Sequence, residues 1–108
     1  MYRARMQDRS ANRHDVTILG HYRAGTGLKR EVTMLDLSES GCRFHDRRTV
    51  LRLDAALTIR IGALGPFDAT VRWIERDTVG VQFARPIYGP VFEHIRTQLD
   101  NSNWRPPA

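Results

Sequence analysis

The chain has a single cysteine, a single lysine and no long apolar run. The lone cysteine, Cys42, cannot form an internal disulfide and provides no cysteine framework for a metal site. No stretch approaches the roughly 20 apolar residues that a membrane-spanning helix needs. The opening residues, MYRARMQDRSANRHD, lack the apolar core of a secretory signal. We therefore expect a cytoplasmic protein that does not insert into a membrane.

Basic residues outnumber acidic ones, and nearly all of them are arginine. The 108 residues include 17 Lys and Arg against 12 Asp and Glu, a formal net charge of +5, and Lys29 is the single lysine. Such a bias can arise from genomic base composition alone. Arginine nevertheless presents a planar fork of N–H donors that suits phosphates and guanine edges, and it stacks on flat rings. The charge therefore favours an anionic partner.

Hydrophobic and polar residues alternate in several short segments, as in half-buried strands. A length of 108 residues and a hydrophobic content of 41% are typical of one soluble domain. The predicted strands cover residues 15–23, 29–37, 42–45, 56–62, 67–75 and 79–83. A charged loop is predicted at 46–54 and a turn at Gly65–Pro66–Phe67. Short strands at this spacing predict an all-β fold, either an antiparallel barrel or a sandwich.

The two ends of the chain depart from this alternation. Residues 1–14 contain four arginines without apolar periodicity, which predicts a flexible basic arm. In residues 89–99, apolar side chains recur at helical spacing after Pro90, which suits a first helical turn. These apolar residues are Val91, Ile95 and Leu99. We expect a domain over residues 15–100, closed by a C-terminal amphipathic helix, and a disordered tail over 101–108.

The stretch DLSESGCRF contains more turn-forming residues than a chain reversal needs. Asp36, Ser38 and Gly41 form D-x-S-x-x-G between the second and third predicted strands. Upstream, Arg9 and Arg13 form R-x-x-x-R just before the first strand. Taken separately, D-x-S-x-x-G could simply close an Asx or Ser turn, and Arg9 and Arg13 could belong to a solvated arm.

Together, in this order and at this separation, the two motifs resemble the PilZ domain, a bacterial receptor module for cyclic di-GMP. The phrases ATVRWIE and VGVQFARP are similar to the family's last two strands, so the resemblance spans about residues 9 to 99. It implies a six-stranded antiparallel β-barrel with a C-terminal α-helix, and neither catalysis nor a cofactor. Many members begin the arginine motif with two adjacent arginines, whereas here Asp8 precedes Arg9. This departure bears on how many ligand molecules bind.

The resemblance also implies a role for each motif residue. Arg9 and Arg13 would lie on a flexible segment that folds over the ligand. Asp36, Ser38 and Gly41 would contact the ligand from the turn.

The chemistry of cyclic di-GMP suits these residue types. Guanine offers O6 and N7 as paired acceptors, which one arginine fork satisfies, and the same guanidinium can stack on the purine or pair with phosphate. The carboxylate of Asp36 can accept from guanine N1–H and N2–H₂, and the hydroxyl of Ser38 can donate or accept. Gly41 allows close backbone approach or a positive φ.

Three further residues are secondary candidates for ligand contact. Arg43 follows the glycine and faces outward, and Arg72 could extend the basic surface. Strict alternation places Trp73 on the inward face with Val71, which favours core packing over ligand stacking. The four histidines are scattered without metal-ligand spacing, so no metal site is expected.

These patterns predict a non-enzymatic cyclic di-GMP sensor that relays the signal by ordering its N-terminal arm and so altering a surface for a protein partner. The alternatives are a ligand-blind PilZ-like adaptor and a small barrel that binds single-stranded nucleic acid. The latter is disfavoured because Phe67, Trp73 and Phe83 all fall on the apolar strand faces, whereas base stacking needs exposed aromatics. Catalysis is disfavoured because Ser38 lacks a G-x-S-x-G elbow and a neighbouring histidine.

Overall fold

The computed structural model of the protein describes residues 14–25, 27–47 and 49–99. The predicted arm over 1–14, except His14, and the predicted tail over 101–108 lie outside these residues. The strands are β1 His14–Arg23, β2 Arg30–Leu37, β3 Gly41–His45, β4 Ala56–Ile61, β5 Leu64–Glu75 and β6 Thr78–Phe83. They are followed by helix α1, Gly89–His94, and a π-helical segment η2, Ile95–Leu99.

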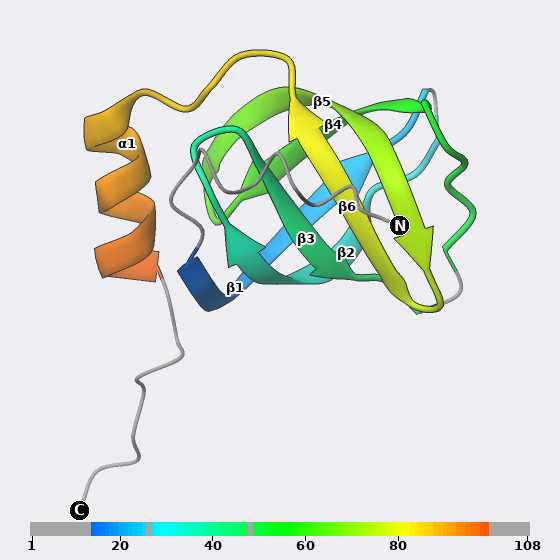
Figure 1. Ribbon diagram of the computed structural model, residues 1–108, viewed down its shortest axis with the longest axis horizontal. Coiled ribbons are helices and arrows are strands. Elements are labelled where there is room, and N and C mark those ends of the chain that lie inside the picture. Colours follow the sequence, from blue (N-terminus) through cyan, green and yellow to red (C-terminus); the bar gives the residue numbers. More distant parts are fainter. Residues whose placement is uncertain (1–13, 26, 48, 100–108) are drawn as a thin grey trace, which may run out of the picture.

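The strands form one closed barrel in the order β1-β2-β3-β6-β5-β4, and all neighbours are antiparallel (Figure 1). This confirms the predicted six-stranded antiparallel barrel and decides against the sandwich. Because the order is circular, the β3–β6 pair lies across the barrel from the β1–β4 pair. The outer surface of the barrel therefore has two opposite faces, each built on one of these pairs.

The barrel interior is filled by the residues that alternation placed on the inner face. Most of them are fully buried, and they include Val16, Ile18, Val32, Met34, Cys42, Phe44, Leu57, Ile59, Ile61, Val79, Val81 and Phe83. Each buried side chain of this size contributes about 1.5 to 3 kcal/mol to folding. The alternation of apolar and polar residues thus predicts the inward-facing side chains correctly for most of the six strands.

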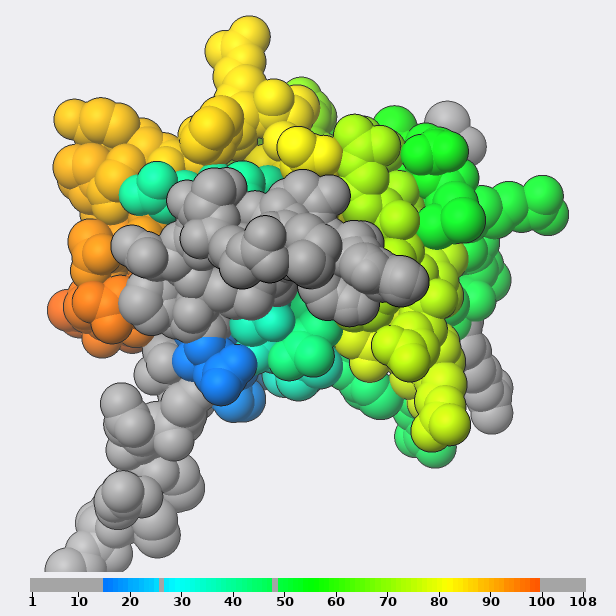
Figure 2. Space-filling view, viewed as in Figure 1, coloured from blue at the N-terminus to red at the C-terminus, as the bar shows by residue number. Residues whose placement is uncertain are grey.

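The C-terminal helical segment covers one end of the barrel, as predicted. Pro90 lies in the first turn of α1, and Phe92 and Ile95 are buried against the core. Figure 2 shows this segment, in orange, at the end opposite the green loop that precedes β4. Of the described helices, none is long and apolar enough to cross a membrane.

The turn between β4 and β5 lies earlier than the predicted turn at Gly65–Pro66–Phe67, and that prediction is wrong. Ile61 pairs directly with Leu64, so the chain reverses over two residues, and Gly62 there has a φ of 60°. Two-residue hairpin turns favour residues that tolerate positive φ. Pro66 lies within β5, where the register with β4 is irregular, and such an irregularity tolerates a residue without an N–H donor.

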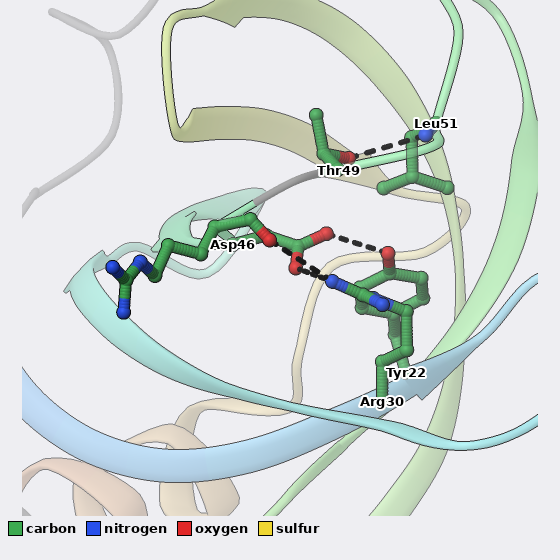
Figure 3. Close-up of polar contacts among 6 residues, drawn as sticks. Tyr22, Arg30, Asp46, Thr49 and Leu51 are labelled. Carbon is green, nitrogen blue, oxygen red and sulfur yellow. Dashed lines mark hydrogen bonds and ion pairs between the residues drawn. The ribbon is translucent and has the colours of Figure 1, made fainter.

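Asp46, the first residue of the charged loop at 46–54, belongs to a buried ion cluster that the sequence pattern does not reveal. The Tyr22 hydroxyl donates to Asp46 Oδ2 at 2.6 Å, and Arg30 Nη2 donates to Asp46 Oδ1 at 2.7 Å (Figure 3). Arg30 Nη2 also donates to the Arg47 carbonyl oxygen at 3.1 Å. The Asp46 side chain is only 2% exposed. The cluster therefore joins the end of β1, the start of β2 and the loop after β3, at the end of the barrel away from α1.

This environment raises the pKa of Tyr22 to about 12, first through burial of the phenol and then through its hydrogen bond to Asp46. The folded-state pKa lies above the ordinary tyrosine pKa of 10.0, so folding favours the protonated phenol. The stability that it contributes is complete below pH 10.0 and is lost as the pH rises towards about 12.

We predict that Tyr22→Phe lowers the free energy of unfolding by about 1.5 to 3 kcal/mol, the range for a hydrogen bond to a charged group. Urea unfolding at neutral pH measures this loss. The variant should also lose less stability than the wild type between pH 10.0 and about 12. Tyr88→Phe is the matched control, since Tyr88 is 73% exposed and should change neither quantity. Equal stability of the two variants would contradict a structural role for the cluster.

Candidate ligand-binding face

The D-x-S-x-x-G residues lie on the β2–β3 hairpin. Asp36 is near the end of β2, Ser38 is in the turn, and Gly41 begins β3. The Ser38 N–H donates to the Gly41 carbonyl at 2.9 Å, and the Ser40 N–H donates to Ser38 Oγ at 3.2 Å. Ser38 is buried, so its hydroxyl shapes the turn in this structure. The contacts of Ser38 in this structure are therefore those of a Ser turn.

Gly41 is required by close approach to β6. A Cβ atom at this position would lie 2.3 Å from the Val81 carbonyl oxygen, which belongs to the backbone and cannot swing away. Gly41 is not among the glycines with positive φ, so close approach, and not the backbone angle, is its role here. Two backbone hydrogen bonds also connect the turn to the end of β6 and to the segment after it. The Phe83 N–H donates to the Ser40 carbonyl, and the Ile87 N–H donates to the Glu39 carbonyl.

Asp36 is paired with Arg43 across the hairpin. Strict alternation after Met34 would point Asp36 into the core, but the β2–β3 register shifts between these two residues. The shift turns Asp36 outward, opposite Arg43, because a one-residue slip exchanges the two faces of a strand. Arg43 Nε lies 3.0 Å from Asp36 Oδ2, an ion pair whose angle falls short of a hydrogen bond. The Asp36 side chain is 6% exposed and that of Arg43 is 37% exposed.

The predicted inward placement of Trp73 is wrong. Val71 pairs with Val81, but Trp73 pairs with Gly80, so Arg72 is an extra residue in β5 and the alternation slips by one. Trp73 consequently lies half-buried on the outer face. A Cβ atom on Gly80 would lie 2.2 Å from Trp73 Cε2 and Nε1, so the indole ring covers the backbone of Gly80.

The strand registers align these groups in one row on the outer face, running across β2, β3, β6 and β5. Asp36 is opposite Arg43, Arg43 is opposite Gly80, and Gly80 is opposite Trp73. We call these four residues the outer row. Asp15, at the start of β1, extends it by one position because it pairs with Asp36. The outer row offers a guanidinium fork held by a carboxylate, together with a partly exposed aromatic ring.

Arg72 is next to the outer row, but it already has partners. Its Nε donates to Gln82 Oε1 at 2.8 Å, and its Nη1 lies 3.5 Å from Asp54 Oδ1. Both of its contacts are on the surface, where such pairs contribute little to stability. The remaining candidates, Arg9 and Arg13, lie outside the described residues.

We predict that Gly80→Ala displaces the Trp73 ring, because the new methyl group would occupy the position of the indole. The variant should lose about 1 to 3 kcal/mol of stability, the typical cost of overpacking. Tryptophan emission measured in a Trp104→Phe background should move to longer wavelength as the ring enters water. Gly89→Ala is the control, since its Cβ would meet nothing closer than Glu39 Oε2 at 3.8 Å. Unchanged emission in Gly80→Ala would refute the placement of the ring.

Comparison with known proteins identifies the family. A search of the curated proteins found no match to the chain. The family model for the PilZ domain matches residues 7–101, which is most of the chain. The match includes the β2–β3 hairpin, the outer row, the helical cap and the R-x-x-x-R segment. The chain therefore belongs to the PilZ domain family, the receptor module for cyclic di-GMP.

Proposed function

We propose that this protein is a non-enzymatic receptor for cyclic di-GMP and that the dinucleotide binds over the outer row. PilZ domains are generally binding modules, which supports a function without catalysis. The observation that carries the proposal is the alignment of Asp36, Arg43 and Trp73 on one outer face, directly beside the D-x-S-x-x-G turn. These groups supply a guanidinium fork for guanine or phosphate and a ring for stacking.

Asp36 and Arg43 are proposed to act as a unit. The Asp36 carboxylate is buried and directed at Arg43, so it can reach a guanine only if Arg43 moves aside. In the arrangement that the structure describes, Asp36 instead orients the Arg43 fork, whose side chain is 37% exposed. Ser38 and Gly41 contribute by fixing the turn at which this pair is presented.

Trp73 is proposed to stack on one base of the ligand. Its ring lies over Gly80, opposite Arg43 along the outer row, so stacking and the arginine fork could serve the same nucleotide. Base stacking on an aromatic side chain is worth about 1 to 3 kcal/mol. Arg72 would add positive charge at the margin of the site while keeping its contacts with Gln82 and Asp54.

The chain connectivity brings the R-x-x-x-R segment within reach of the outer row. Asp15 pairs with Asp36, so β1 begins beside the row. Arg13 immediately precedes β1, and Arg9 is four residues further back. An extended chain spans at most about 3.6 Å per residue, so both arginines can reach a ligand on this face. Ordering of this segment over the ligand would change the surface seen by a protein partner.

The outward position of Trp73 bears on the nucleic-acid alternative. One of the three aromatics that the alternation placed inside lies on the outer face, whereas Phe83 is buried and Phe67 is half-buried. A strand-binding groove needs a series of stacking rings for successive bases, and the outer row has one. The ligand-blind adaptor differs from our proposal only in the absence of cyclic di-GMP binding, which titration decides.

We predict that calorimetric titration shows saturable binding of cyclic di-GMP and at least tenfold weaker binding of cyclic di-AMP, a difference of about 1.4 kcal/mol. The reason is that adenine has a donor, N6, where guanine has the O6 acceptor that arginine requires. GTP and single-stranded DNA are the control ligands. Equal affinity for the two cyclic dinucleotides would leave only charge attraction, and no binding of cyclic di-GMP to the folded protein would identify a ligand-blind adaptor.

A second prediction distinguishes the two motif arginines from positive charge in general. Arg9→Lys or Arg13→Lys keeps the net charge but removes the planar fork. Each replacement should cost about 1 to 3 kcal/mol, roughly a five- to 150-fold loss of affinity for cyclic di-GMP. Arg3→Lys and Arg5→Lys are charge-matched controls outside the motif and should have no effect. If all four variants bound alike at fixed salt, the segment would act only as an electrostatic attractant.

A further inference from the structure

A second candidate site lies on the opposite side of the barrel from the outer row. An open hollow of about 310 Å³ is lined by His21, Arg23, Thr58, Arg60 and Pro66. These residues come from β1, β4 and the start of β5, whereas the outer row is centred on β3 and β6. Figure 1 shows β3 and β6 in front and β1 and β4 behind them. The family motifs include none of the lining residues, and we call this site the basic hollow.

The strand register gathers cationic groups at the basic hollow. His21 is opposite Arg60, and Arg23 is opposite Thr58, on the paired strands β1 and β4. Arg60 Nη1 donates to the Gly65 carbonyl at 3.2 Å, which anchors the guanidinium at the rim near Pro66. A guanidinium has five N–H donors, so this bond leaves most of them for a ligand.

The two arginines of the basic hollow have no carboxylate partner among the described residues. Other arginines of the barrel do: Arg30 is paired with Asp46 and Arg43 with Asp36. Crowding of unpaired like charges disfavours the folded state, and a bound anion removes this repulsion. Neither Arg23 nor Arg60 forms an ion pair with a described carboxylate, so both guanidinium groups can bind an external anion.

Three positive groups and one acid surround His21. Arg23 is on its own strand, Arg60 is opposite on β4, Lys29 is in the loop before β2, and Glu31 is opposite on β2. Burial lowers the pKa of His21, the charges of Lys29, Arg60 and Arg23 lower it further, and Glu31 raises it. Beyond Thr58, the next residue across on β5 is Asp68. The positive charge around the hollow thus exceeds the negative charge, and it favours the neutral form of His21.

We infer that the basic hollow binds an acidic segment of a partner protein, whose Asp and Glu carboxylates accept hydrogen bonds from Arg23 and Arg60. Paired arginine forks are well suited to carboxylates. The barrel is closed, so no strand edge is free and recognition has to use side chains. The lining contains no Phe, Tyr or Trp, and a single histidine ring cannot stack successive bases, which favours an acidic peptide over a nucleic acid.

The inferred contact has a pH dependence of defined sign. A carboxylate bound beside His21 favours the protonated imidazole and raises its pKa relative to the free protein. Binding therefore takes up protons, and the affinity should increase as the pH falls from about 8 to about 6, the range in which histidine titrates. His21→Gln should remove this increase, so that the affinity of the variant changes little between the two pH values.

The test uses the full chain and a dye-labelled peptide of about six alternating Asp and Glu residues as the probe, followed by fluorescence anisotropy. We expect saturable binding that Arg23→Ala/Arg60→Ala weakens at least about tenfold. Arg52→Ala/Arg85→Ala is the charge-matched control, since both arginines are exposed and neither lines the hollow, and it should weaken binding less than about twofold. Thermal unfolding establishes that both double variants are folded.

Four results would overturn the inference. These are the absence of saturable binding up to about 1 mM peptide, equal losses in the two double variants, tighter binding of a single-stranded oligonucleotide of matched charge, and displacement of the peptide by cyclic di-GMP. The inference does not depend on the proposed function, because the two sites are on opposite faces. Peptide binding without cyclic di-GMP binding would refute the proposed function alone, and the reverse result would refute the basic hollow alone.

Discussion

Closure of six short strands into one barrel is the constraint on which the rest of the structure depends. A closed barrel has a filled interior, so each strand must divide its residues strictly between an inner and an outer face. Where the sequence breaks its own alternation, only an extra residue in one strand can restore the division. Such irregularities occur in β2 before Asp36 and in β5 before Trp73. Both turn a residue outward that would otherwise point into the core.

These two irregularities create the outer row. An aspartate carboxylate in the apolar interior would be very costly, whereas on the outer face Asp36 meets the guanidinium of Arg43. An indole pointing inward would overfill a core that already contains Phe44 and Tyr22. On the outer face it covers Gly80, where the absence of a side chain leaves room for the ring. Local geometry that preserves the core thus also produces the candidate site.

Much of this architecture can be predicted from the sequence because alternation measures burial directly. The six strands, most of their inner residues and the helix that contains Pro90 follow from periodicity alone. Trp73 and the turn at Gly62 could not be placed in this way, since a bulge or a two-residue turn changes the pattern by a single position. Tyr22 and Asp46 were missed for another reason: their contact joins residues 24 positions apart, and periodicity contains no information about such pairs.

In the candidate site, too, contacts between residues close in the sequence could be predicted, whereas contacts made by strand pairing could not. The D-x-S-x-x-G spacing locates the hairpin, and the contacts of Ser38 with Gly41 and Ser40 are local enough to be expected from it. The role of Gly41 depends on Val81, which is distant in the sequence and becomes adjacent only when β3 pairs with β6. Pairing of Arg43 with Asp36 likewise required the register of β2 and β3.

Strand β1 connects the two faces that we assign to ligands. Asp15, near its start, lies beside the outer row, and His21 and Arg23, at its end, line the basic hollow. The residues between them, Val16 and Ile18, are packed in the core, so the strand is held as part of a rigid wall. If both proposals hold, the basic hollow would be an attachment point that keeps a partner on the barrel while cyclic di-GMP binds on the opposite face.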